Sequence, residues 1–300
     1  MKTAEAVSVN VVVPHERYDR TWDSIVASGP MKDRLLRWAL LSLQLRAKLP
    51  YETTALHGLI VLHGPPGTGK TTLARGLAQT LAPLTGTGHA RLLELSLHGL
   101  MSAEHGQSQQ KVSELLTEVV PALADDGLPT VVLLDEVESM AVARSEASLS
   151  ANPADVHRAT DAVLTALDDN ATRYPHLLMV ATSNFTTALD AAFLSRADVV
   201  VEVPVPDATA AKAILRATLT DMVSAYPPLA TLAADHGLAA IAELLAGRDG
   251  RQIRKIVTEA MASRLETVRN PAELGLADLH QAALRVHGEQ KDARLSNAEV

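Results

Sequence analysis

Residues 58–72 read GLIVLHGPPGTGKTT and decide the fold of the chain. The apolar run that ends at Leu62 is typical of a buried strand, and the pattern that follows Lys70 is typical of a helix. Between them lies a glycine-rich loop of the form G-x-x-x-x-G-K-[ST], in the strand–loop–helix context that a phosphate-binding loop requires. We therefore predict a nucleoside triphosphate site formed by Pro66, Gly67, Thr68, Gly69, Lys70, Thr71 and Thr72.

The residue types of this loop suit ATP and magnesium. Glycines let consecutive backbone N–H groups turn toward a polyphosphate, and the N-terminus of the helix adds a partial positive charge. Lys70 is expected to reach the β- and γ-phosphates, and Thr71 to place its hydroxyl on Mg²⁺. So short a motif also occurs by chance in ordinary loops, but the flanking strand and helix favour phosphate binding.

Composition excludes several classes of protein. The 300 residues include no cysteine, which excludes disulfides, thiol nucleophiles and zinc–thiolate sites, and the eleven histidines are scattered without ligand spacing. The net charge of −8 argues against a broad nucleic-acid surface. No apolar run approaches the roughly 20 residues that span a bilayer, and the N-terminus lacks a signal-peptide pattern. We expect a cytoplasmic protein that binds neither membrane nor nucleic acid.

Strand and helix patterns alternate up to about residue 203. Buried or half-buried strands are expected at 58–62, 90–97, 130–134, 177–181 and 199–203, with helices between them. This alternation predicts an α/β fold, a five-stranded parallel sheet covered by helices on both faces. After Pro204 only helical patterns remain. We predict a short N-terminal extension (1–30) that includes a short strand at 7–13, a large nucleotide-binding domain (31–206) and a small all-helical lid domain (207–300).

Two carboxylates follow the third strand of this series. Asp135 and Glu136 come directly after the apolar run 130–134, at the carboxyl end of a parallel strand, where such sheets bind ligands. Asp135 is expected to hold Mg²⁺ through water, and Glu136 to act as the base for the attacking water. An Asp-Glu pair also suits the first turn of a helix, but the phosphate-binding loop upstream favours the catalytic role.

Three further polar residues fit the same site. Asn184 follows the fourth strand and would orient the water, although asparagine is also a common turn residue. Arg196 precedes the fifth strand and would reach the γ-phosphate bound by a neighbouring subunit, an effect worth roughly 10³–10⁵ in rate where it operates. Arg251 begins a helix of the small domain and would contact the nucleotide. Either arginine is otherwise an ordinary solvated side chain.

Together these residues resemble the AAA+ ATPases, and a longer stretch resembles the meiotic pachytene-checkpoint family. The most specific part, within 134–198, includes the runs LDEVESM at 134–140 and AVLTALD at 162–168, the run TSNF at 182–185 and the triplet Arg196-Ala197-Asp198. The Ala- and Leu-rich composition is similar to that of a bacterial branch associated with cyclic-oligonucleotide anti-phage signalling.

This resemblance implies an ATP-hydrolysing homohexamer that engages and partly unfolds a HORMA-domain protein. By separating the HORMA protein from a cyclic-oligonucleotide synthase, such an enzyme restrains antiviral signalling. In related enzymes an aromatic pore-loop residue grips the substrate, whereas residues 101–108 here read MSAEHGQS. Met101, Glu104 and His105 are the candidate pore-loop residues, and without an aromatic contact face we expect limited unfolding rather than long threading.

Two other readings remain. One is an AAA+ ATPase that acts on nucleic-acid complexes, which the acidic charge disfavours and salt-dependent DNA binding would support. The other is an ATP-gated switch with a different protein client. Glu136 and Arg196 argue against a pure switch, which needs neither of them.

Overall fold

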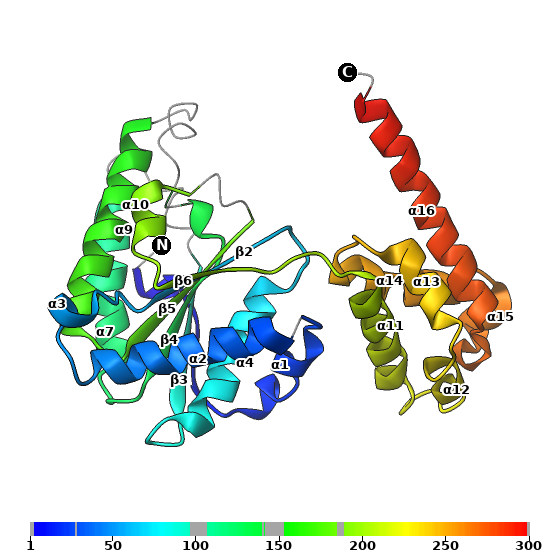
Figure 1. Cartoon of the computed structure of the whole chain (residues 1–300), viewed down its shortest axis with the longest axis horizontal. Coiled ribbons are helices and arrows are strands. Elements are labelled where there is room, and N and C mark those ends of the chain that lie inside the picture. Colours follow the sequence, from blue (N-terminus) through cyan, green and yellow to red (C-terminus); the bar gives the residue numbers. More distant parts are fainter. Residues whose placement is uncertain are drawn as a thin grey trace. The chain divides into compact units, whose positions relative to one another are not determined.

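The computed structural model describes residues 3–27, 29–96, 107–139, 141, 153–184 and 189–298. Within them the chain divides into two compact units, one made of the described parts of Met1–Gly64 and Gly69–Val203 and the other of Pro65–Thr68 and Pro204–Val300. Figure 1 shows an α/β unit in blue to green and a helical unit in yellow to red.

A six-stranded sheet forms the centre of the first unit. Its strands lie in the order β1-β3-β4-β5-β2-β6. Their bounds are β1 Val7–Val13, β2 Leu59–His63, β3 Ala90–Leu95, β4 Thr130–Leu134, β5 Leu177–Ser183 and β6 Val199–Glu202. All neighbours from β3 to β6 run parallel. The predicted parallel β/α series is thus confirmed, with the phosphate-loop strand β2 between β5 and β6.

The predicted number of five strands is wrong, because residues 7–13 join the sheet. Strand β1 pairs antiparallel with β3, from Val13 opposite Ala90 to Val7 opposite Leu95. Its side chains alternate between exposed and half-buried, and only Val13 is fully buried. That alternation is typical of an antiparallel edge strand with one solvated face. The strand assigned to an N-terminal extension therefore covers the open edge of β3.

Alternate residues of the parallel strands supply two separate cores. On β2, Leu59 and Val61 pack on one face and Ile60 and Leu62 on the other. Helices α2 and α4 cover the second face, whereas α6, η4, α7 and α9 cover the first (Figure 1). Burial on both faces explains why these strands read as continuous apolar runs in the sequence.

The helices of the first unit connect these strands. Their bounds are η1 Thr3–Ala6, η2 Glu16–Tyr18, α1 Thr21–Ser24, α2 Gly29–Arg46, α3 Tyr51–Thr54, α4 Lys70–Leu81, η3 Ala82–Leu84, α6 Gln107–Glu114, the π-helical turn η4 Leu115–Val119, α7 Val120–Leu123, η5 Val137–Ser139, α9 Pro153–Arg173 and α10 Ala191–Ser195. The segment around α1 packs on the phosphate loop and its helix. A Cβ at Gly69 would lie 2.4 Å from Ile25 Cδ1, and one at Gly76 would lie 2.6 Å from the Trp22 nitrogen.

Beyond Pro204 every described element is a helix. The bounds are α11 Ala208–Met222, α12 Leu229–Ala233, α13 Leu238–Leu245, α14 Gly250–Met261, α15 Leu265–Arg269, η7 Pro271–Glu273 and α16 Leu276–Ala298. Two helical stretches of this unit, 229–245 and 250–269, are each divided into two helices. The first breaks where Asp235 accepts a hydrogen bond from the Gly237 N–H (2.7 Å), and the second breaks at Arg264, whose backbone is extended. None of the described helices is long and apolar enough to cross a membrane.

Candidate nucleotide-hydrolysis site

The predicted site residues of the first unit gather along the edge of the sheet that the carboxyl ends of the parallel strands form. Strands β2, β4 and β5 are parallel neighbours, so their carboxyl ends meet at the same edge. Lys70 and Thr71 follow β2, Asp135 and Glu136 follow β4, and Asn184 follows β5. The structure thus brings together five residues from three distant parts of the sequence.

Two glycines of the phosphate loop occupy positions where a side chain does not fit. Gly64 has φ 146°, and a Cβ there would lie 2.2 Å from the carbonyl oxygen of Val203. Gly69, with φ 95°, is the residue before helix α4. This left-handed backbone favours glycine and turns the chain so that helix α4 begins at Lys70. The loop is therefore shaped by backbone requirements that only glycine meets.

Lys70 links the loop to the strand β5. Its Nζ donates to the Gly64 carbonyl oxygen at 2.8 Å and to Asn184 Oδ1 at 2.9 Å, and the residue is buried. Burial lowers the pKa of Lys70, while the carboxylates of Glu138, Asp135 and Glu136 oppose that shift. One ammonium thus faces three carboxylates. A triphosphate entering this edge would need additional positive charge, which a divalent cation supplies.

Oxygen atoms suited to that cation lie next to Lys70. Thr71 Oγ1 donates to Asp135 Oδ1 at 2.7 Å, and Thr182 Oγ1 donates to the same carboxylate oxygen at 2.5 Å. Hydroxyl and carboxylate oxygens are ligands that Mg²⁺ prefers, and Mg²⁺ is commonly held by one or two side chains together with substrate phosphates. Among the described residues no group of three or more histidine or acidic side chains could hold a metal by itself. Thr71 and Asp135 therefore fit a magnesium ion that is shared with a nucleotide.

Glu136 has a strained backbone directly after β4. Its φ is 53°, one of two positive values among the described non-glycine residues. Its N–H donates to Thr182 Oγ1 at 3.1 Å, which fixes the turn. Strain of this kind costs roughly 1–3 kcal/mol and persists where the surroundings hold it. Asp135 and Glu136 also border a cavity of about 220 Å³, large enough for several water molecules.

Two residues at this edge were missed by the sequence analysis. Thr182 binds both Asp135 and the Glu136 backbone. Glu138 Oε1 accepts from the side-chain Nδ2 of Asn184 at 3.0 Å and from the backbone N–H of Asn184 at 3.1 Å. The register offered a signal for Thr182: because Leu134 lies opposite Ala181, the next residues, Asp135 and Thr182, are also side by side. Glu138 had no comparable signal, because its contact depends on the turn after β4.

Arg196 lies at the opposite edge of the sheet, which the amino ends of the parallel strands form. It precedes β6, and the Asp198 N–H donates to the carbonyl oxygen of Leu59, the first residue of β2. Lys70 follows the other end of β2, which is five residues long, so about 16 Å of strand separates the two edges. Arg196 is therefore remote from the phosphate loop of its own chain.

The remaining predicted residues lie elsewhere. Arg251 is in the second unit, in the first turn of α14, where Asp249 caps the helix by accepting from the N–H groups of Arg251 and Gln252, each at 2.9 Å. Met101, Glu104 and His105, the predicted pore-loop residues, lie outside the described residues.

Comparison with known proteins decides the family. Residues 60–205 match the family model described as "ATPase family associated with various cellular activities (AAA)". CD-NTase-associated protein 6 of Pseudomonas aeruginosa is 45% identical over 270 residues, which cover 90% of this chain and 88% of that protein. The chain belongs to the AAA ATPase family. More narrowly, it belongs with CD-NTase-associated protein 6, as the resemblance to the bacterial branch predicted.

Eukaryotic relatives and solved structures agree with this placement. The pachytene checkpoint protein 2 homolog of Arabidopsis thaliana is 35% identical over 216 residues, and the chain covers 46% of its length. The structure of C. elegans PCH-2 matches with a TM-score of 0.75 at 25% identity, and the match covers 94% of this chain and 75% of the PCH-2 chain. A chain from the E. coli MS115-1 HORMA:CdnC:Trip13 complex matches with a TM-score of 0.76 at 17% identity, and the match covers 95% of this chain and 97% of that one. The predicted AAA fold and the nucleotide-binding character of this AAA ATPase are confirmed.

Proposed function

We propose that this chain is a magnesium-dependent ATPase that hydrolyses ATP to ADP and phosphate. The observation that carries the reaction is the contact of Lys70 with Asn184 beside the Thr71–Asp135 pair. It joins the phosphate loop to the ends of two other strands, where the family binds nucleotide. Thr71 and Asp135, the latter through water, would hold Mg²⁺, which supplies charge neutralisation of the phosphates when bound.

The side chains of this edge divide the catalytic work. Lys70 binds the β- and γ-phosphates, and Glu136 accepts a proton from the attacking water. Asn184 orients that water through its amide, whose orientation is held by Lys70 on one side and Glu138 on the other. Arg251 contacts the nucleotide from the helical unit and couples that unit to hydrolysis.

The position of Arg196 supports catalysis between two copies of the chain. Arg196 lies at the edge opposite Lys70, about 16 Å of strand away, and therefore serves a phosphate only if that phosphate is bound by a neighbouring copy. A closed ring gives each copy one such neighbour, in accord with the proposed homohexamer. The arginine finger acts there by stabilising the charge of the transition state.

The proposed client is a HORMA-domain protein. CD-NTase-associated protein 6 is associated, by its name, with a CD-NTase, and the related Trip13 fold was solved together with HORMA and CdnC. We infer that the chain spends ATP on partly unfolding the HORMA protein and separating it from a cyclic-oligonucleotide synthase. In a cytoplasmic setting this separation would restrain anti-phage signalling. The pore-loop candidates Met101, Glu104 and His105 would contact the client.

A disassembly assay tests this function. A purified bacterial HORMA protein bound to its cyclic-oligonucleotide synthase is incubated with the chain, ATP and Mg²⁺, and free and bound partners are separated by size-exclusion chromatography. We expect the complex to dissociate with the wild-type chain and to persist with Glu136→Gln. A complex that stays intact while the wild-type chain hydrolyses ATP would reject the HORMA client and leave the ATPase.

A further inference from the structure

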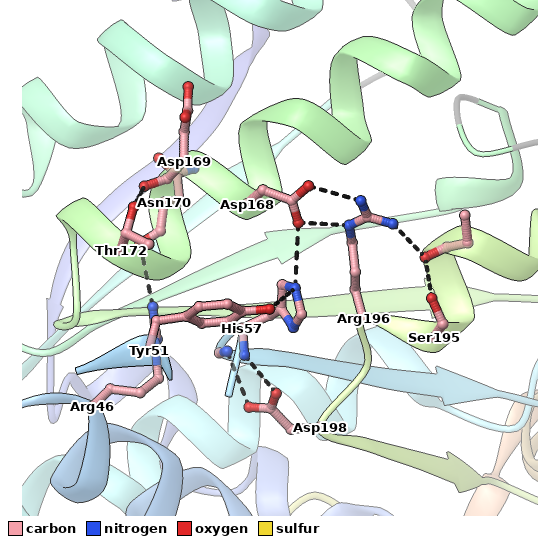
Figure 2. Close-up of polar contacts among 12 residues, drawn as sticks. Arg46, Tyr51, His57, Asp168, Asp169, Asn170, Thr172, Ser195, Arg196 and Asp198 are labelled. Atoms are coloured by element: carbon pink, nitrogen blue, oxygen red, sulfur yellow. Dashed lines mark hydrogen bonds and ion pairs between the residues drawn. The ribbon is translucent and has the colours of Figure 1, made fainter. Parts of the chain in front are cut away.

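A polar cluster surrounds Arg196 at the edge of the sheet opposite the phosphate loop (Figure 2). Its guanidinium makes a two-pronged ion pair with Asp168 of α9: Nε donates to Oδ1 and Nη2 to Oδ2, both at 2.7 Å. Nη1 donates to the carbonyl oxygen of Ala192 at 2.9 Å. The arginine proposed as the finger is thus bound to a carboxylate of its own chain.

Asp168 has a second partner, the imidazole of His57. His57 Nε2 lies 3.3 Å from Asp168 Oδ1, the oxygen that also accepts from Arg196 Nε. The Arg196 hydrogen bonds lower the pKa of Asp168, so the carboxyl is ionised at neutral pH and has no proton to share. A hydrogen bond between this carboxylate oxygen and Nε2 therefore requires the hydrogen to be on Nε2. The Tyr51 hydroxyl lies 3.0 Å from the same nitrogen, and its oxygen can then only accept from it.

His57 is held in place by its own backbone. The N–H groups of His57 and Gly58 donate to the two carboxylate oxygens of Asp198, at 2.9 and 3.0 Å. Ser42 Oγ donates to Asp198 as well, at 2.9 Å. The imidazole side chain is only 12% exposed. It therefore stays within reach of Asp168 whether or not Arg196 remains there.

The charges around His57 link its protonation to the position of Arg196. Burial lowers the pKa of His57 and so does Arg196, whereas Asp168 and Asp198 raise it. If Arg196 leaves, the imidazole loses a nearby cation and becomes the main partner of the Asp168 carboxylate. Both changes favour the protonated imidazolium. A proton taken up from solvent by His57 would then replace the charge of Arg196 beside Asp168.

We propose that Asp168 is a latch that holds Arg196 within its own chain, and that His57 is a positioning residue that takes over Asp168 when Arg196 swings to a neighbouring copy's phosphate. A guanidinium neutralised by two hydrogen bonds to a carboxylate offers less charge to a developing phosphate anion. Arg196 must therefore be released from Asp168 before it can stabilise the transition state with its full charge. This inference rests on the proposed role of Arg196 in trans.

Substitution of Asp168 tests the latch. Asp168→Asn weakens the pair with Arg196, and we expect the ATPase rate per subunit at saturating ATP to rise roughly two- to fivefold, the range expected for a partly exposed ion pair. Asp169→Asn is the matched control, because it removes the same charge from the next position of α9 and Asp169 has no side-chain contact with Arg196. A rate of Asp168→Asn at or below that of Asp169→Asn would overturn the latch.

A pH profile tests His57 separately. The wild-type rate relative to that of His57→Gln should rise as the pH falls from about 8 to about 6, the range in which histidine titrates. Glutamine keeps a donor for Asp168 but takes up no proton, and the other ten histidines are common to both proteins. A constant ratio across this range would overturn the role of His57.

Arg196→Ala distinguishes the proposed latch from the proposal on which it rests, that Arg196 acts in trans. If Arg196→Ala hydrolyses ATP as fast as the wild type, the finger itself is rejected and the latch with it. If Arg196→Ala is slow and Asp168→Asn is equally slow, the finger stands and only the latch is overturned, because Asp168 would then support Arg196 rather than restrain it. A slow Arg196→Ala with a fast Asp168→Asn is the result that the proposal expects.

Discussion

Lys70 Nζ donates to Asn184 Oδ1 at 2.9 Å, although the two residues are 114 positions apart. The contact joins the phosphate loop after β2 to the end of β5, and Asn184 is joined in turn to Glu138. A change in what Lys70 binds would thus change the contacts of Asn184, the residue proposed to orient the water. This relationship makes the carboxyl edge of the sheet one connected unit.

Lys70→Ala should lose ATP affinity by roughly tenfold or more, the effect of removing hydrogen bonds to a charged group. The loss leaves Asp135, Glu136 and Glu138 facing the phosphates without an ammonium between them. Titration with a fluorescent ATP analogue measures it. Lys48→Ala, which removes an exposed lysine, is the matched control and should bind as the wild type does.

Glu136→Gln should bind ATP with nearly unchanged affinity and hydrolyse it roughly 10²–10⁴ times more slowly. Glutamine keeps the size of the side chain and the backbone bond to Thr182, but it does not accept the proton of the attacking water. Phosphate release and nucleotide binding are measured on the same preparation. Turnover equal to that of the wild type would remove Glu136 from its assigned role.

Mixing Arg196→Ala with Glu136→Gln should restore ATPase activity that neither variant shows alone. In a mixed assembly, an intact Glu136 of one copy meets an intact Arg196 of its neighbour, so some sites are complete. The rate is measured against the ratio of the two variants at constant total protein. A mixture no faster than the sum of its parts would place Arg196 outside catalysis in trans.

Asp278→Asn should destabilise the helical unit at neutral pH and make little difference in acid. Arg264 binds both oxygens of Asp278 at 2.7 and 2.8 Å, and these hydrogen bonds lower the pKa of Asp278. A carboxyl with a lower pKa in the folded state stabilises it above the unfolded pKa, near 4, and loses that contribution as the pH falls through the folded value.

Urea unfolding of the wild type and Asp278→Asn at several pH values measures this effect. The two midpoints should differ most near pH 7 and converge progressively as the pH falls below the unfolded pKa, near 4. Asp235→Asn is the control for charge, because this exposed carboxylate of the same unit accepts from the Gly237 N–H and, within the described part of the chain, makes no ion pair. A difference between the midpoints that stays constant with pH would mean that the ion pair does not contribute through the charge of Asp278.

The nucleotide edge was predictable because its signals are local in sequence. The glycine loop, Asp135 and Asn184 each follow an apolar run, and parallel strand ends converge by topology. The cluster at the other edge was not predictable in this way. Asp168 lies on α9 and Arg196 follows α10, 28 residues later, while His57 reaches Asp168 from the loop before β2. No periodicity encodes such side-chain contacts. A strand at 7–13 was predicted, but its place in the sheet was not, because its partner β3 comes some 80 residues later in the chain.

The most direct test of the account is the ATPase rate per subunit against protein concentration, with and without a bacterial HORMA protein bound to its cyclic-oligonucleotide synthase. The account predicts a rate that rises with concentration, because Arg196 acts on a neighbouring copy, and that rises again when the HORMA complex is added. A slow rate that is independent of concentration and unaffected by the HORMA complex would contradict it.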